Sequence, residues 1–262
     1  MRVTVLGCGG SGGVPLIGCR CAVCTSADPR NIRSRVSILV ESSAGTRILV
    51  DASPDLRQQF LANDITTVDA VILTHAHADH LHGIDDLRSV NFHRNAPLDV
   101  WGDRETIAQA TRRFDYAFEA PRTNKGSWYA PSLVPRVIEG AAVQVRDIAV
   151  TTFNQIHGGS RPPTLGLRFG RFAYSTDVLE LPEAAFAALE GIDVWIVDCL
   201  QEAPSPAHSH LAQTLGWIAR VKPRRAILTH MNHHLDYAAL AAKLPRGVEP
   251  GRDGLVIDVA EL

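Results

Sequence analysis

Short hydrophobic runs separated by polar turns recur along the whole chain. Runs of this length with alternating or continuous hydrophobic residues predict β-strands. The expected strands span residues 2–6, 37–41, 47–50, 69–73, 142–153 and 164–169. Because short turns join many of them, the pattern predicts largely antiparallel pairing.

Helical patterns fall between these runs. The segment 54–61 has Ser53 as a candidate cap and Pro54 at its first position, which is typical of a helix start. The other expected helices span residues 104–118, 182–189, 211–221 and 235–244. Two mixed sheets with helices outside, in the α/β class, fit this order. No repeat or linker divides the chain, so we expect one domain over residues 1–262.

The longest stretch without a periodic pattern is EAPRTNKGSWYAPSLVPR, residues 119–136. Loops of this length are either surface insertions or functional flaps. A flap would carry Trp128 and Tyr129. The two alternatives stay open.

Composition narrows the class of protein. The chain has 262 residues, of which 45% are hydrophobic and 21% charged, and no run approaches the twenty apolar residues of a membrane span. The start, MRVTVLGCGG, lacks the features of a secretory signal, so a cytoplasmic location is expected. A net charge of −2 makes nucleic acid an unlikely partner. Five cysteines in a reducing compartment argue against a disulfide framework.

The segment THAHADH directly follows the hydrophobic run DAVIL. It places His75, His77, Asp79 and His80 within six residues. His75 and His77 point the same way if the chain is extended, while Asp79 and His80 can turn to a second position. Imidazole and carboxylate are natural ligands of zinc-like ions, so this segment predicts a site for two metals.

Three further residues each end a hydrophobic run: His157 in FNQIHGG, Asp177 in YSTDV and His230 in ILTHM. Together with THAHADH they give HxHxDH…H…D…H, and the chain resembles the metallo-β-lactamase superfamily over nearly its whole length. The resemblance implies an αββα sandwich. It also implies one metal on His75, His77 and His157, a second on Asp79, His80 and His230, and Asp177 as the bridge. Asp51, at the end of RILVD, matches a carboxylate that orients a ligand histidine.

The segment GCRCAVC places Cys19, Cys21 and Cys24 close together, one ligand short of a tetrahedral zinc site. His233 and His234 follow His230 and can supply the fourth. The chain is similar to a narrower group, the phosphoribosyl cyclic phosphate phosphodiesterases, in which GCxCxxC pairs with the histidine of LTHxxH. That resemblance selects His233 and implies a structural Cys₃His zinc site. Cys8 and Cys199 are expected to be buried small residues.

The same group carries a histidine proposed to protonate the leaving oxygen. In APSPAHSHL the candidates are His208, which fits better by its distance from Leu211, and His210. Asp79 is expected to act in catalysis as well as in metal binding. His82, His93 and His234 are interpreted as structural or solvated.

The two-metal site predicts a hydrolase of phosphate or acyl bonds, and the resemblance implies a phosphodiesterase that acts on a small cyclic phosphate or nucleotide-like ester through a hydroxide bridging two zinc or manganese ions. A thioesterase or lactonase would use the same metal core. A processing nuclease is disfavoured because no long basic surface is evident. A non-catalytic metal or redox sensor is the alternative outside enzymes. The sequence does not determine the substrate, the native metal or the oligomeric state. A homodimer is compatible with it.

Overall fold

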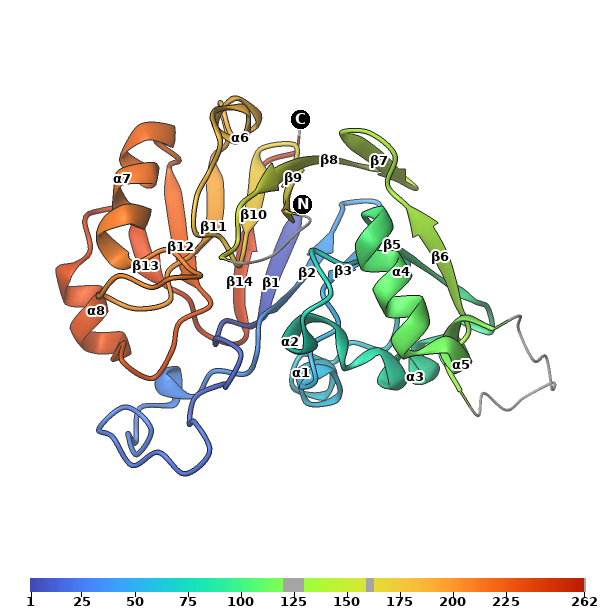
Figure 1. Cartoon of the computed structure of the whole chain (residues 1–262), viewed down its shortest axis with the longest axis horizontal. Coiled ribbons are helices and arrows are strands. Elements are labelled where there is room, and N and C mark those ends of the chain that lie inside the picture. The colour runs from blue at the N-terminus through green and yellow to red at the C-terminus, as the bar shows by residue number, and fades with distance from the viewer. Residues whose placement is uncertain (120–129, 159–162, 262) are drawn as a thin grey trace.

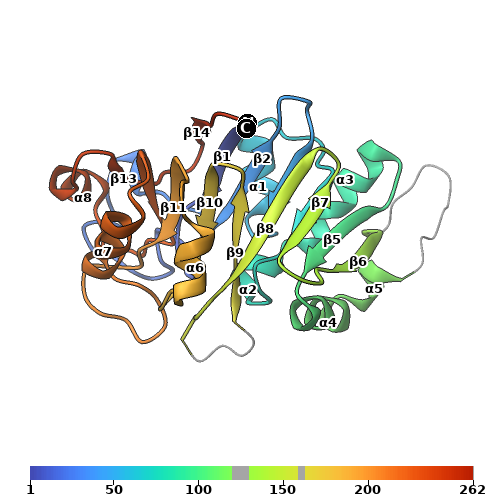
Figure 2. The ribbon, with the colours of Figure 1, turned by 90° about the horizontal axis from the view of Figure 1, so that it is seen from above.

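The computed structural model describes residues 1–119, 130–158 and 163–261. Two seven-stranded sheets lie face to face, with helices on both outer sides (Figures 1 and 2). The αββα arrangement expected from the sequence is confirmed.

The first sheet has the strand order β14-β1-β2-β3-β4-β5-β6. Pairs from β14 to β3 are antiparallel, and those from β3 to β6 are parallel. Its strands are β14 (Leu255–Asp258), β1 (Arg2–Gly7), β2 (Ser37–Glu41), β3 (Arg47–Val50), β4 (Ala70–Ile72), β5 (Leu98–Gly102) and β6 (Leu133–Val137). Its helices are α1 (Leu56–Ala62), α2 (Ala78–Leu81), α3 (Leu87–Arg94), α4 (Arg104–Arg113) and α5 (Asp115–Phe118).

The second sheet has the order β13-β12-β11-β10-β9-β8-β7. Here β10 to β13 pair in parallel and β7 to β10 pair antiparallel. Its strands are β13 (Val248–Pro250), β12 (Arg225–Thr229), β11 (Val194–Asp198), β10 (Phe172–Ser175), β9 (Thr164–Phe169), β8 (Ile148–Gln155) and β7 (Ala142–Val145). The helices of this half are α6 (Glu183–Ala188), α7 (Leu211–Val221) and α8 (Tyr237–Lys243).

The core that joins the two sheets is hydrophobic on both inner faces. Val3, Val5 and Ile48 of the first sheet belong to one buried cluster with Leu167 and Trp195 of the second. A separate cluster fills the space between the first sheet and its helices. Both sheets therefore have rigid strands whose ends can hold side chains in fixed positions.

The expectation of largely antiparallel sheets was wrong, because half of each sheet is parallel and its strands are connected by helices. The segment 142–153, expected as one strand, is the hairpin β7–β8. The segment 104–118 is two helices, α4 and α5, that meet at Phe114. Part of the expected loop 119–136 is β6, the last strand of its sheet, where an edge position tolerates Pro135. Trp128 and Tyr129 lie outside the described residues.

None of the helices in the described segments is both long enough and apolar enough to cross a membrane.

Candidate metal centre

The ligand-type residues of THAHADH lie where β4 leads into α2. All three residues of β4 are buried, and the loop after the strand carries His75 and His77. Asp79 and His80 belong to the short helix α2. The turn from strand to helix therefore directs side chains from neighbouring positions toward two different points.

One group of candidate ligands joins His75 and His77 to His157 and Asp177. Their ligand atoms all lie within 4.8 Å of one another. His157 follows β8 and Asp177 follows β10, so the second sheet completes the group. Asp177 Oδ1 lies 3.8 Å from His75 Nε2 and 3.6 Å from His157 Nε2.

A second group contains Asp79, His80, His230 and again Asp177, with the same 4.8 Å limit. Asp177 Oδ2 lies 3.0 Å from His80 Nε2 and 3.3 Å from His230 Nε2. Because each oxygen of Asp177 faces a different group, this carboxylate is placed to be shared by two cations.

The nitrogens that face this space fit a metal ion. His75 Nε2, His80 Nε2 and His230 Nε2 are buried and make no hydrogen bond of regular geometry within the described residues; their polar neighbours are the carboxylates of the two ligand groups. Buried polar atoms normally make such a hydrogen bond. Meanwhile the outer nitrogen of His80 lies 2.8 Å from Asp51, and that of His75 lies 3.1 Å from the Thr74 hydroxyl. An imidazole held from behind with its other nitrogen free is the usual state of a metal ligand.

Electrostatics also favours a cation here. Burial lowers the pKa of His75 well below its usual value. Burial opposes protonation of His80 too, but the charges of Asp177 and Asp79 outweigh it and raise its pKa well above the usual value. His230 behaves similarly, and its pKa rises to about 9 against the effect of burial. A divalent ion would replace the protons that these carboxylates hold on His80 and His230.

At three of these strand ends the backbone has a left-handed conformation, which residues other than glycine rarely adopt. The φ angles are 62° at Asp51, 52° at Asp177 and 57° at His230. Such left-handed residues cost about 1–3 kcal/mol each and cluster at functional sites. This backbone conformation turns each side chain away from its strand and toward the centre.

His208 lies in this centre, whereas His210 does not. His208 Nε2 is 3.9 Å from Asp177 Oδ1, and its ring lies 4.6 Å from that of His157 and 4.5 Å from that of His230. His210 lies outside both ligand groups, at the position just before α7.

Asp198 is a residue of this site that the sequence reasoning missed. It ends β11, and its Oδ2 lies 3.1 Å from His208 Nδ1 and accepts a hydrogen bond from the backbone of Val178. It also belongs to a third ligand-type group with His208 and His230. The signal was present in VWIVD, a hydrophobic run that ends in an aspartate in the same way as RILVD.

Gly158 allows the segment before His208 to come close to His157. A side chain at this position would meet Pro206 O at 2.2 Å. Without one, His157 Nδ1 reaches Ala207 O at 2.7 Å. This contact orients His157 and places the next residue, His208, over the centre.

The three cysteines form a group of their own in the loop after β1. The sulfur atoms of Cys19, Cys21 and Cys24 lie within 4.8 Å of one another. The carbonyl oxygen of His233, not its ring, lies 3.6 Å from Cys21 Sγ. The His233 ring lies 4.3 Å from the His234 ring and is not part of the group. Cys8 and Cys199 are buried.

Two of the histidines that were interpreted as structural or solvated lie outside the ligand groups. His82 contacts Phe114, with ring centres 5.5 Å apart, and His93 contacts Phe92 at the same distance.

Comparison with known proteins agrees with this geometry. Residues 46–231 match the family model of the β-lactamase superfamily domain. An octanoyltransferase of Porphyromonas gingivalis is 34% identical over 257 residues, which cover 97% of this chain and 51% of that protein. The chain thus spans about half the length of that relative.

Several solved structures match almost the whole chain, among them the following two. A diphosphatase of the PhnP family is 33% identical, with a TM-score of 0.90 over 99% of this chain and 98% of that one. Zinc-bound PqqB from Methylobacterium extorquens is 22% identical, with a TM-score of 0.80 over 99% of this chain and all of that one, a likeness that concerns the fold alone.

Proposed function

Because the chain belongs to the metallo-β-lactamase superfamily, and is a hydrolase of it, we propose that it is a phosphodiesterase for a small cyclic phosphate or nucleotide-like ester. The observation that carries the proposal is the position of His208 beside both ligand groups. Similarity to a diphosphatase of the PhnP family supports hydrolysis at phosphorus. Two zinc or manganese ions, when bound, would supply charge neutralisation at the phosphoryl group and activation of water.

The ligand roles are divided as the two groups indicate. His75, His77 and His157 would hold one ion and Asp79, His80 and His230 the other, with Asp177 shared. This set of nitrogen and oxygen donors suits zinc, and carboxylates also suit manganese.

The residues of the chain have separate tasks in the reaction. In the proposed reaction His208 carries a proton on both ring nitrogens: Nδ1–H donates a hydrogen bond to Asp198 Oδ2, and Nε2–H faces the ligand groups. The oxygen of one water joins phosphorus and the bond to the leaving oxygen breaks. His208 then gives its Nε2 proton to that oxygen and regains one from the consumed water. We also propose a catalytic role for Asp79 beside metal binding; its Oδ2 lies 3.5 Å from His230 Nε2 within the second ligand group.

Two substrates with different leaving groups test this assignment. His208→Ala should reduce kcat for a cyclic alkyl phosphate by about 10²- to 10⁴-fold, because an alkoxide needs a proton to leave. Hydrolysis of bis(p-nitrophenyl) phosphate should fall much less, since p-nitrophenolate leaves unprotonated. His210→Ala is the matched control. Equal losses on both substrates would remove the acid role from His208.

An acyl substrate is the second candidate, favoured by the octanoyltransferase relative. Half of that protein lies outside the match, so its name does not decide the chemistry of this chain. The native enzyme should be tested on an octanoyl thioester and a lactone beside both phosphodiesters. Preference for either acyl compound would overturn the phosphodiesterase proposal, and no turnover of any of them would favour a metal sensor.

We further propose a structural zinc ion on Cys19, Cys21, Cys24 and His233. The short distances among the three sulfur atoms support this site. Only the carbonyl oxygen of His233 is near Cys21 Sγ, so the His233 ring would have to turn toward the sulfur atoms to bind the ion. Cys21→Ser should lose about one zinc per chain and lower the melting temperature, because a structural zinc site contributes to folding. Cys199→Ser is the control for thiol loss. Unchanged zinc content and melting temperature in Cys21→Ser would exclude the site.

A further inference from the structure

Two buried neutral side chains support the chain around Asp177. Gln155 is the last residue of β8 and Thr164 is the first residue of β9, and the antiparallel register places them directly opposite each other. Gln155 is 0% exposed and Thr164 is 1% exposed. Polar groups that are buried so deeply need hydrogen-bond partners, and both side chains find them in the backbone beside Asp177.

The two side chains bond the carbonyl groups on either side of the Asp177 Cα atom. Gln155 Nε2 donates to Thr176 O at 2.6 Å. Thr164 Oγ1 donates to Asp177 O at 3.0 Å. The first bond fixes the peptide plane before the Cα atom, and the second fixes the plane after it. Since φ and ψ are the only soft torsions of the backbone, the two bonds together determine the direction in which the Asp177 side chain leaves it.

The conformation that these bonds hold is a strained one. Asp177 has a φ of 52°, and a strained residue keeps its conformation only where the surrounding structure imposes it. The peptide that follows Asp177 is bonded on both sides, because its C=O accepts from Thr164 and its N–H, that of Val178, donates to Asp198 Oδ2 at 3.0 Å. Rotation of this peptide would break both bonds.

The direction of the Asp177 side chain matters because its carboxylate faces two ligand groups. Its Oδ1 lies 3.6 Å from His157 Nε2 in one group, and its Oδ2 lies 3.0 Å from His80 Nε2 in the other. A change in φ or ψ would move both oxygen atoms together, so a gain at one group would be a loss at the other. Both ions can share this carboxylate only if the backbone of Asp177 is held in place.

The start of β9 also contacts the turn that carries the first ligands. Leu165 N–H donates to Thr74 O at 3.1 Å, and the Thr74 hydroxyl lies 3.1 Å from His75 Nδ1. Thr164 and its neighbour therefore bond both Asp177 and the residue before His75. These contacts hold ligands from the two sheets at a fixed separation.

We propose that Gln155 and Thr164 are positioning residues, which direct the carboxylate of Asp177 so that two metal ions can share it. The inference rests on the proposed two-metal hydrolase. Both residues act through main-chain carbonyl groups. Because both donors are neutral and bond the backbone, the full negative charge of the carboxylate is left for the cations.

The hydroxyl group of Thr164 can be tested separately from its volume. Thr164→Val keeps the shape and removes the donor, whereas Thr164→Ser keeps the donor and removes a methyl group. In manganese-loaded protein, electron paramagnetic resonance should show that the two ions of the wild type are magnetically coupled. In Thr164→Val the coupling should weaken, and the affinity for the second ion should fall by about 10- to 100-fold, as is typical when an outer partner of a ligand is lost. Thr164→Ser should behave like the wild type.

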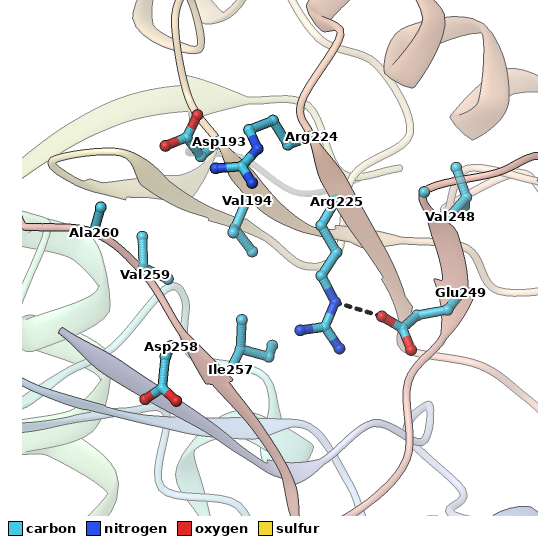
Figure 3. A pocket seen from close by; sticks show the side chains of 11 residues that line it. Asp193, Val194, Arg224, Arg225, Val248, Glu249, Ile257, Asp258, Val259 and Ala260 are labelled. Carbon is cyan, nitrogen blue, oxygen red and sulfur yellow. Dashed lines mark hydrogen bonds and ion pairs between the residues drawn. The ribbon is translucent and has the colours of Figure 1, made fainter.

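A second variant and two controls make the result specific. Gln155→Met removes the other donor at similar length and should have the same effect as Thr164→Val. Thr152→Val makes the threonine-to-valine exchange at another buried position of β8. Glu249→Gln alters the opposite end of the second sheet, where Glu249 bonds Arg225 at the start of β12 at 2.5 Å (Figure 3). Both controls should keep the coupling and the affinity of the wild type, and melting temperatures check the folding of every variant.

The outcomes separate this inference from the proposed function. A wild type without a coupled pair of ions would contradict the two-metal proposal itself. A coupled pair that persists unchanged in Thr164→Val and Gln155→Met would overturn the positioning role alone. The role would also be overturned if Thr164→Ser were as impaired as Thr164→Val, since volume would then matter more than the donor, or if either control lost the coupling equally.

Discussion

The two halves of the molecule supply the metal centre in different ways. The first half contributes four ligand-type residues from the single turn between β4 and α2. The second half contributes His157, Asp177 and His230 one at a time, from the ends of different strands. Adjacent residues meet because the chain is short between them, whereas distant residues meet because parallel strands end at one edge of a sheet. The first set forms a visible cluster in the sequence. The members of the second set were assigned through the resemblance to the superfamily, and the fold shows why they meet.

Both halves also hold an imidazole from behind with a buried aspartate. In the first half Asp51 lies 2.8 Å from Nδ1 of His80, which belongs to a ligand group. In the second half Asp198 lies 3.1 Å from Nδ1 of His208, the proposed acid. The same contact would thus support metal binding in one half and the proposed proton transfer in the other.

The largest expected effect comes from the carboxylate that serves both groups. Asp177→Asn should reduce hydrolysis by at least about 10³-fold even at saturating metal, beyond the 10- to 100-fold typical of an outer partner. Asparagine keeps the size of the side chain but loses the charge that faces His80 and His230. Turnover with metal analysis measures the effect, and circular dichroism checks folding. Near-normal activity would show that the two groups act separately.

The difference between the halves also limits what the sequence predicts. The THAHADH segment was readable because contiguous ligands are a local pattern, and hydrophobic runs predicted two mixed sheets with helices outside, whereas the αββα sandwich was implied by the resemblance to the superfamily. Asp198 was not readable, because an aspartate after a hydrophobic run gains meaning only when β11 lies beside β10 and β12. The choice between His208 and His210 depended on a register difference of two residues, which the close approach of Gly158 to Ala207 determines.

Matched substitutions of the two supporting aspartates should give opposite patterns. Asp51→Asn should weaken metal binding by about 10- to 100-fold, with hydrolysis restored by excess metal. The Asp198→Asn variant should keep both metals. Asp198 Oδ1 lies 3.9 Å from Nδ1 of the ligand His230, which is too far for a hydrogen bond, so Asp198 does not orient that ligand. The variant should lower kcat for an alkyl leaving group by about tenfold or more and spare bis(p-nitrophenyl) phosphate. Metal titration and kcat on both substrates separate the cases, and identical behaviour of the two variants would remove the proposed division.

The smallest effect concerns Asp253, which lies between β13 of the second sheet and β14 of the first. Its Oδ1 accepts a bond from the Cys8 backbone at 3.1 Å, and its Oδ2 accepts one from the Ser34 backbone at 2.7 Å. Burial raises the pKa of this carboxyl from 3.8 to about 6, although the bonds from Ser34 oppose the shift. Between these values the folded chain keeps a proton that the unfolded chain releases, so this contribution to stability is complete below pH 3.8 and is lost as the pH rises through 6.

Replacing Asp253 with asparagine removes that titration. A shift of two pKa units corresponds to about 2.7 kcal/mol for a fully buried group, and partial exposure of Asp253 reduces this to about 1–2 kcal/mol. The wild-type free energy of unfolding should therefore fall by that amount relative to Asp253→Asn between pH 4 and pH 7, as measured by urea denaturation. A wild-type advantage that grows with pH would mean that the carboxylate form is the one that joins the two halves.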